Sequence, residues 1–203
     1  STFECKACSN RCEIHKVSIE GQKPLHYGSR CGRFDDQKKY KKGEGLPELF
    51  KEREDFLLHT YDKEQPDDPM DVRIGMPRAL TFFDQFPFWK AFFTELGCEV
   101  VLSDPTNRQI ISDGAEHLTT ETCFPIKVAH GHVVNLMAKD VDYVFLPNII
   151  NMEEEADFVH SYLCPLVQSL PHLIRTAFSD EVESEELALL APLLHFERGR
   201  KHI

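Results

Sequence analysis

Four cysteines near the N-terminus form the clearest chemical pattern in the sequence. Cys5, Cys8 and Cys12 are separated by two and three residues, and Cys31 follows a stretch that contains glycines. Closely spaced thiolates can turn inward around one cation, and four of them complete the tetrahedral shell of structural zinc. The same set can hold a [4Fe–4S] cluster. We therefore predict that these four cysteines bind zinc or an iron–sulfur cluster.

Two features bear on the choice between zinc and a cluster. Zinc ribbons pair two knuckles, whereas Cys31 has no other cysteine close to it in the sequence, which favours a cluster. His15 and His26 could each replace a thiolate, which keeps zinc open. The nearby Arg11 and Arg30 would offset the excess thiolate charge in either case.

A second group of reactive side chains surrounds Cys123. The segment TTETCFP at 119–125 leads into a predicted helix with Pro125 in its first turn, which places Cys123 at the helix N-terminus. The helix dipole favours a thiolate there. Lys127 and His130 follow on the same helical face. The alternative is a buried structural thiol beside a salt-bridged lysine.

Cys164 is a second thiol in a similar setting, because Pro165 and an apolar helix pattern follow it. The carboxyl ends of parallel strands meet at one edge of a sheet, and predicted strands are followed by Arg78, Glu121, Cys123 and Asn148. We therefore expect these side chains to converge. The candidate catalytic residues are Arg78, Glu121, Lys127 and His130.

The elements that must position these residues alternate between strand and helix patterns. Apolar runs predict strands at 72–76, 98–102, 115–118 and 143–146, with Cys98 in the core. Helical periodicity predicts helices at 82–96, 107–112 and 124–138, and others around 160–170 and 182–195. Pro87 predicts a kink or a split. The pattern predicts an α/β fold, with a Rossmann-like, doubly wound, mainly parallel sheet after a small cysteine-rich metal-binding segment.

Three zones divide the chain. Residues 1–33 form the cysteine-rich metal or cluster knuckle, 34–71 a charged connector with one helix, and 72–203 the Rossmann-like domain. The first residue is Ser1 rather than Met, and the last residues form no closing element. We therefore expect a piece of a longer protein, truncated at both ends.

Composition disfavours several classes of function. The 203 residues carry a net charge of −11, which disfavours nucleic-acid binding. No apolar run is long enough for a membrane span, and no signal peptide is evident. Seven unevenly spread cysteines are typical of ligand chemistry in a reducing cytoplasm. A P-loop and a dinucleotide fingerprint are both missing from the sequence.

The α/β zone contains the motifs RIGMPRAL at 73–80, FPFW at 86–89, VLSDPT at 101–106, ETCFPIKVAHGH at 121–132 and FLP at 145–147. These motifs resemble those of the acyl-CoA dehydratase activase-related proteins, the long relatives of the 2-hydroxyglutaryl-CoA dehydratase activators. The N-terminal zone resembles the segment after the ATPase domains of those proteins, through CSNRCEI at 8–14 and YGSRCGR at 27–33.

This resemblance implies a full-length protein with actin/Hsp70-like ATPase domains before residue 1 and a cluster-binding, dehydratase-like later half. It implies that Cys123 and Cys164 are ligands of a second [4Fe–4S] cluster, with a third ligand beyond Ile203. The full-length protein would be an ATP-coupled CoA-enzyme activase or reductase of anaerobes, supplying low-potential electrons to an acyl-CoA dehydratase-type partner. This chain alone is not expected to be catalytic.

Two other hypotheses remain open. One is a zinc-stapled structural or interaction module of a larger protein, with no redox role. The other is a thiol enzyme that uses Cys123 with His130, although no third residue is evident that would orient the imidazole.

Overall fold

The structure is a computed structural model that describes residues 1–7, 10–34, 47–59, 69–153 and 160–198. The chain divides into two compact units, Ser1–Arg53 and Glu54–Ile203. The division falls within the segment predicted as a charged connector. Cys8, one of the four predicted N-terminal ligands, lies outside the described residues.

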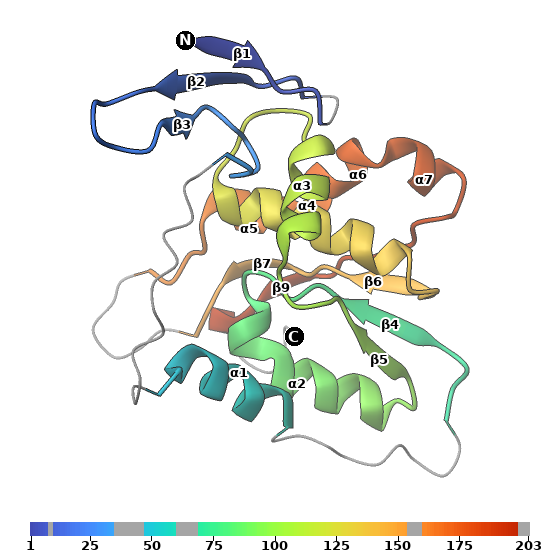
Figure 1. Cartoon of the computed structure of the whole chain (residues 1–203). Coiled ribbons are helices and arrows are strands. Elements are labelled where there is room, and N and C mark those ends of the chain that lie inside the picture. The colour runs from blue at the N-terminus through green and yellow to red at the C-terminus, as the bar shows by residue number, and fades with distance from the viewer. Residues whose placement is uncertain (8–9, 35–46, 60–68, 154–159, 199–203) are drawn as a thin grey trace. The chain divides into compact units, whose positions relative to one another are not determined.

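The N-terminal unit is built on a three-stranded antiparallel sheet (Figure 1). Its strands β1 (Thr2–Glu4), β2 (Glu13–Val17) and β3 (Leu25–Tyr27) lie in the order β1-β2-β3. Just after β3 the chain passes very close to β2. At Gly28 φ is +105° and a Cβ would lie 2.4 Å from the Glu13 carbonyl oxygen, so this position requires glycine.

In the second unit, strands and helices alternate. The first elements are β4 (Arg73–Met76), α2 (Phe82–Glu95), β5 (Glu99–Leu102), α3 (Arg108–Glu116) and α4 (Phe124–Met137). They are followed by β6 (Tyr143–Phe145), β7 (Asn148–Asn151), α5 (Pro165–Gln168), α6 (Leu170–Ala177), α7 (Ser179–Glu183), β8 (Leu189–Leu190), β9 (Leu193–His195) and the 3-10 turn η1 (Phe196–Arg198). Helix α1 (Leu49–His59) spans the division between the units. Within the residues that the structure describes, no helix combines the length and apolarity needed to cross a membrane.

Four strands of the second unit form a parallel sheet in the order β5-β4-β6-β8. β7 and β9, which come shortly after β6 and β8, form a second parallel pair. The chain leaves β4 for β5 on one side and returns to β6 on the other side of β4. The carboxyl ends of β4 and β6 therefore form a topological switch point. The predicted α/β fold with a parallel sheet is confirmed.

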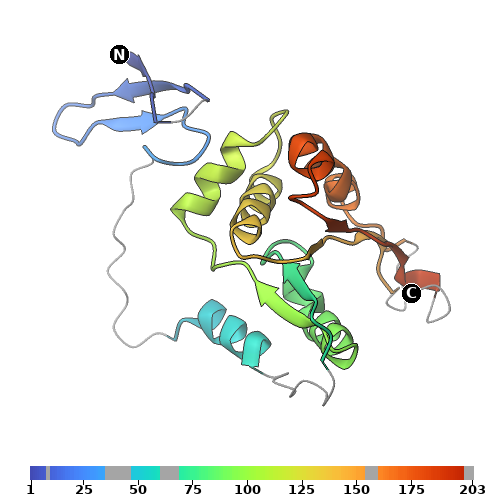
Figure 2. The same ribbon diagram turned by 90° about the vertical axis from the view of Figure 1, so that its right-hand side faces the viewer.

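Helices cover both faces of this sheet, as the two views in Figures 1 and 2 show. On one face the aromatic side of α2 packs on the strands through Phe82, Phe86, Trp89 and Phe93. On the other face α4 and α6 contribute Ile126, Ala129, Val133, Leu136, Leu170 and Ile174. Neighbouring residues of β6 separate the two cores, because Val144 belongs to the second cluster and Phe145 to the first. A buried parallel sheet of this kind has no face in water.

The structure corrects three of the predicted elements. Residues 115–118 are the end of α3 and the bend after it, not a strand, and α3 runs to Glu116 instead of ending at 112. The helix predicted at 182–195 is wrong, because α7 ends at Glu183 and the segment continues into β8 and β9. The split predicted at Pro87 is also wrong, because α2 is a single helix.

Tertiary packing explains these differences. Gly114 lies where α3 crosses α4, and a Cβ there would come within 2.0 Å of the Lys127 carbonyl oxygen. This glycine therefore permits a close helix crossing rather than a helix end. Pro87 cannot donate a helical hydrogen bond, but the buried Phe86 and Trp89 beside it hold α2 on the sheet. β8 and β9 are too short to show a period, and their parallel partners define them.

Candidate functional site

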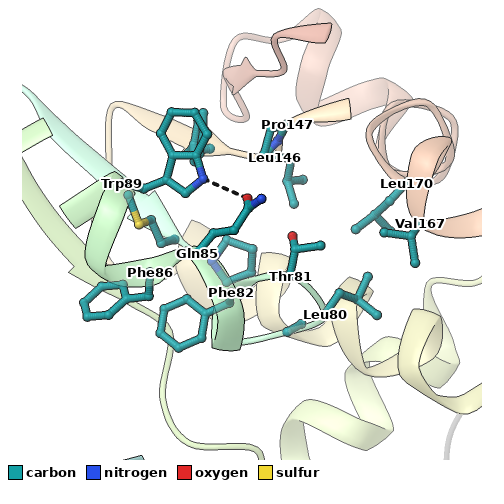
Figure 3. Close-up of a pocket in the computed structure, with 14 residues that line it drawn as sticks. Leu80, Thr81, Phe82, Gln85, Phe86, Trp89, Leu146, Pro147, Val167 and Leu170 are labelled. Carbon is teal, nitrogen blue, oxygen red and sulfur yellow. Dashed lines mark hydrogen bonds between the residues drawn. The ribbon is translucent and has the colours of Figure 1, made fainter. Parts of the chain in front are cut away.

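A pocket lies at the switch point, where the carboxyl ends of β4 and β6 meet (Figure 3). The loop after β4 forms one wall, and Leu146 and Pro147 after β6 form another. Helix α2 and the start of the α5–α6 segment complete it, the latter through Val167 and Leu170. The cavity measures about 50 Å³ and is partly open to solvent. Crevices at this position bind ligands in open parallel sheets.

Two polar side chains line this mostly apolar pocket. The Oε1 atom of Gln85 accepts a hydrogen bond from Trp89 Nε1 at 3.0 Å, which fixes the orientation of the amide. Gln85 Nε2 lies 3.4 Å from the thioether sulfur of Met152, a weak acceptor. Thr81 is the N-cap residue of α2, but its side chain makes no capping hydrogen bond. Figure 3 shows the Gln85 amide and the Thr81 hydroxyl directed toward the same space.

The backbone of the pocket wall is strained at Leu80. This residue has φ +54°, in the left-handed region that a bulky side chain rarely adopts. Such a conformation costs on the order of 1–3 kcal/mol and persists only where surrounding structure imposes it. Strain of this kind gathers at ligand-binding and catalytic sites, and here it falls on a residue that lines the pocket.

Arg78 belongs to the same loop, but its side chain turns elsewhere. Its Nη2 pairs with Glu54 at 2.5 Å, and its backbone N–H donates to Ser103 Oγ at 2.8 Å. The Arg78 Nε atom is buried and has no hydrogen-bond partner among the described residues. Arg78 is therefore a positioning residue for the loop after β4 and does not line the pocket.

A buried network fixes that loop from behind. The Ser103 hydroxyl lies 2.8 Å from His132 Nδ1, and His132 Nε2 lies 3.0 Å from Thr106 Oγ1. Burial, and next the nearby Arg78, lower the pKa of His132 to about 4, so the ring is neutral at pH 7. Both Ser103 and His132 are almost fully buried. The pair resembles a catalytic dyad in distance only, because a substrate cannot reach the hydroxyl.

Cys123 is the N-cap residue of α4, as predicted, and Pro125 lies in the first turn. Its thiol is exposed, whereas Lys127 and His130 are buried. The Lys127 ammonium pairs with the Glu121 carboxylate. The His130 Nδ1–H donates to the Ile126 carbonyl oxygen at 2.8 Å, and burial lowers its pKa. Lys127 is therefore paired with Glu121, and His130 is hydrogen-bonded within its own helix.

Cys164 has a setting similar to that of Cys123, because it is an exposed N-cap residue and is followed by Pro165 in the first turn of α5. Ile126 and Val167, each three residues after one of these thiols, belong to the same hydrophobic cluster. The two helix starts thus come from one packed region. Asn148 does not join them, because its buried amide donates to the Ala191 carbonyl oxygen at 3.1 Å and ties β7 to the segment before β9.

The N-terminal thiols lie at one end of the three-stranded sheet. Cys5 follows β1 and Cys12 precedes β2, and the Cys5 N–H donates to the Cys12 carbonyl oxygen at 2.8 Å. Cys31 follows β3, and all three are half-buried free thiols. Among the described residues, no group of three or more His, Cys, Asp or Glu side chains is close enough to hold a metal ion. Cys8 lies outside the described residues.

Residues 73–203 match a known domain family. A family model described as the CoA enzyme activase uncharacterised domain (DUF2229) matches residues 73–203. The chain belongs to this family. No curated protein and no solved structure matches the chain. In this CoA enzyme activase domain, the matched segment holds the whole parallel sheet, Cys123, Cys164 and the residues that line the switch-point pocket.

Sequence reasoning missed the pocket of this CoA enzyme activase domain. The stripe of phenylalanines in α2 has the pattern of an ordinary core face, and Phe82, Phe86 and Phe93 are indeed buried. One clue was present: Gln85 lies four residues before Trp89 within an otherwise aromatic stripe. A polar side chain at helical spacing inside an apolar face is informative, because a buried amide needs a partner.

Proposed function

We propose that this chain is part of an ATP-dependent iron–sulfur activator or reductase related to 2-hydroxyacyl-CoA dehydratase activation. In this proposal it helps to supply low-potential electrons. The observation that carries the proposal is the placement of Cys123 and Cys164. Both are exposed thiols at helix starts, and the turns that follow them pack into one cluster.

The side chains around Cys123 fit a cluster. The 14-residue helix α4 begins at this thiol, and its dipole favours the thiolate that a cluster requires. The hydroxyl of Thr122 is buried and has no hydrogen-bond partner among the described residues. Hydrogen bonds to cluster sulfurs tune the reduction potential, and Thr122 is the donor beside Cys123 that could make one.

A bound [4Fe–4S] cluster would supply one-electron chemistry at low potential. In this proposal Cys123 and Cys164 hold it together with a ligand from outside the chain. The buried Lys127, already paired with Glu121, places a positive charge in the first turns behind Cys123. ATPase domains of the same full-length protein provide ATP coupling, and an acyl-CoA dehydratase-type enzyme in the cytoplasm is the partner. The domain family to which the chain belongs supports this assignment.

The N-terminal unit is proposed to hold zinc or a second cluster through Cys5, Cys8, Cys12 and Cys31. Its hydrophobic core is very small, because Ile14 is its one fully buried hydrophobic residue among those described. Units without a core depend on metals or other staples. This observation also supports the alternative function, a zinc-stapled structural or interaction module with no redox role.

The decisive experiment measures iron, zinc and acid-labile sulfide, with a visible spectrum, on the anaerobically purified chain. Two double variants separate the sites: Cys5→Ser with Cys8→Ser, and Cys123→Ser with Cys164→Ser. Cys98→Ala is the matched control, since it removes a buried core thiol. The same measurements are made on the full-length protein, because it contains the ligands that lie outside this chain.

Each outcome distinguishes the proposals. Iron and sulfide that are lost in the Cys123 and Cys164 variant, and kept in the Cys98 control, support the redox function. Zinc alone, lost in the Cys5 and Cys8 variant, supports the structural module. The redox proposal is contradicted if the full-length protein binds no iron. It is also contradicted if the iron content is the same in both double variants as in the unmodified protein.

A further inference from the structure

The size of the switch-point pocket limits what it can hold. The cavity measures about 50 Å³, whereas an apolar cavity of roughly 150 Å³ takes benzene. It therefore encloses only a few heavy atoms of a ligand. Because the pocket is partly open, the remainder of a longer molecule can extend into solvent.

The lining of the pocket defines a polar end and an apolar end. Gln85 and Thr81 supply an amide N–H and a hydroxyl from α2. Leu80, Val167 and Leu170 supply the apolar side (Figure 3). The Gln85 carbonyl oxygen is committed to Trp89, and one amide N–H is directed to the weak acceptor Met152, so the second N–H is the donor that remains for a ligand. A carbonyl oxygen is the matching acceptor.

The pocket selects against charged ligands. None of the described residues that line it is charged, and the guanidinium of Arg78 in the same loop is directed to Glu54. A carboxylate placed here would lose its hydration without gaining a partner of opposite charge. An uncharged ligand loses much less hydration free energy when it enters the pocket.

We propose that the switch-point pocket binds a short, uncharged aliphatic group that carries one carbonyl oxygen, as in a primary amide or an ester. The aliphatic part packs against Leu80, Val167 and Leu170, and the carbonyl accepts hydrogen bonds from Gln85 and Thr81. The strained backbone at Leu80 holds that side chain at the wall of the pocket. This site needs no metal, so its test is independent of the redox proposal.

Trp89 gives a direct readout, because it is the single tryptophan and its indole N–H is bonded to Gln85. The chain is titrated with butyramide and separately with butyrate, and the Trp89 indole peak is followed by ¹H–¹⁵N NMR. Butyramide should shift this peak with an affinity on the order of 1–10 mM, as expected for so small a ligand. Butyrate should bind at least about 10-fold more weakly, because its charge must be desolvated.

Two variants and one control complete the test. Ala79 lines the pocket, so the larger side chain of Ala79→Leu fills it and should abolish the shift. Thr81→Val keeps the shape of the side chain and should weaken binding about 5-fold, the worth of one hydrogen bond. Leu96→Ala changes the exposed C-cap residue of α2, outside the pocket, and should bind normally. The proposal is wrong if butyramide leaves the peak unmoved, if butyrate binds equally well, or if folded Ala79→Leu still responds.

Discussion

Replacing Gly131 by alanine should drive α3 and α4 apart. A Cβ at this position would lie 1.8 Å from the Ile110 carbonyl oxygen and 2.7 Å from the carbonyl carbon. Ordinary van der Waals contact begins at 3.4 Å, which is 1.6 Å more than the shorter distance. The obstacle is helix backbone, which cannot turn aside as a flexible side chain can. One helix must therefore move as a body.

Two effects of opposite sign set the magnitude of this change. Overpacking of a tight contact costs about 1–3 kcal/mol, and a displaced helix backbone belongs at the upper end of that range. Alanine gains about 1 kcal/mol over glycine in helix propensity. We therefore expect the free energy of unfolding to fall by about 2 kcal/mol. Gly114→Ala should act alike, because its Cβ would meet Lys127 O at 2.0 Å.

Trp89 makes the assay simple, because this single, buried tryptophan reports only on the second unit. Its fluorescence should show a urea midpoint lowered by about 1 M in Gly131→Ala at an unchanged slope. The double variant Gly131→Ala with Gly114→Ala should lose less free energy of unfolding than the two single variants lose together. Once the helices have moved apart, the same gap accommodates both methyl groups. Gly75→Ala is the control in the same unit, because its Cβ would meet side-chain methyl groups of Val141 and Leu136 at 3.1 and 3.3 Å rather than helix backbone, and it should lose less stability. A Gly131→Ala protein stabilised by about 1 kcal/mol, the value from propensity alone, would refute the close crossing.

Two further predictions concern His132 and the thiols. His132 has a pKa of about 4 in the folded protein and 6.5 when unfolded, so the unfolded state takes up the proton first as pH falls. Its contribution to stability is complete above pH 6.5 and is lost toward pH 4, so this residue alone should make the protein about 2 kcal/mol less stable to urea at pH 5 than at pH 7. His132→Asn should remove this share of the pH dependence, whereas the share from His130, whose pKa burial also lowers, should remain. In metal-free protein, iodoacetamide should modify Cys123 and Cys164 in the native state, and mass spectrometry should find Cys98 modified only after unfolding, because Cys98 is buried and burial raises its pKa.

The strongly patterned elements of the sheet could be predicted from the sequence. The strands β4, β5 and β6 are apolar runs, and the helices α2 and α4 have caps or turns that mark their limits. Cys123 was placed correctly because proline is favoured in the first turn of a helix, where Pro125 stands. These features depend on local chemistry, which a sequence displays directly.

The failures arose where distant contacts decide the outcome. The helix α3 was predicted to end at 112, but Gly114 continues it, because the missing side chain lets a backbone pass that is 13 or more residues away in the chain. The short strands β8 and β9 exist because β6 and β7 offer them parallel partners. The pocket depends on the strand order β5-β4-β6-β8, which puts the ends of β4 and β6 side by side. A strand order is a property of the fold rather than of any one segment.

Helix α5 connects the two sites proposed for this domain. Cys164 is its N-cap residue, and Val167, three residues later, lines the switch-point pocket. Three residues are about one helical turn, so a ligand that packs on Val167 lies close to the backbone that sets the position of the thiol. α5 has only four residues and is anchored by its apolar contacts. Filling the pocket therefore acts on the same short element that presents Cys164, which gives the ligand a physical route to influence chemistry at that sulfur.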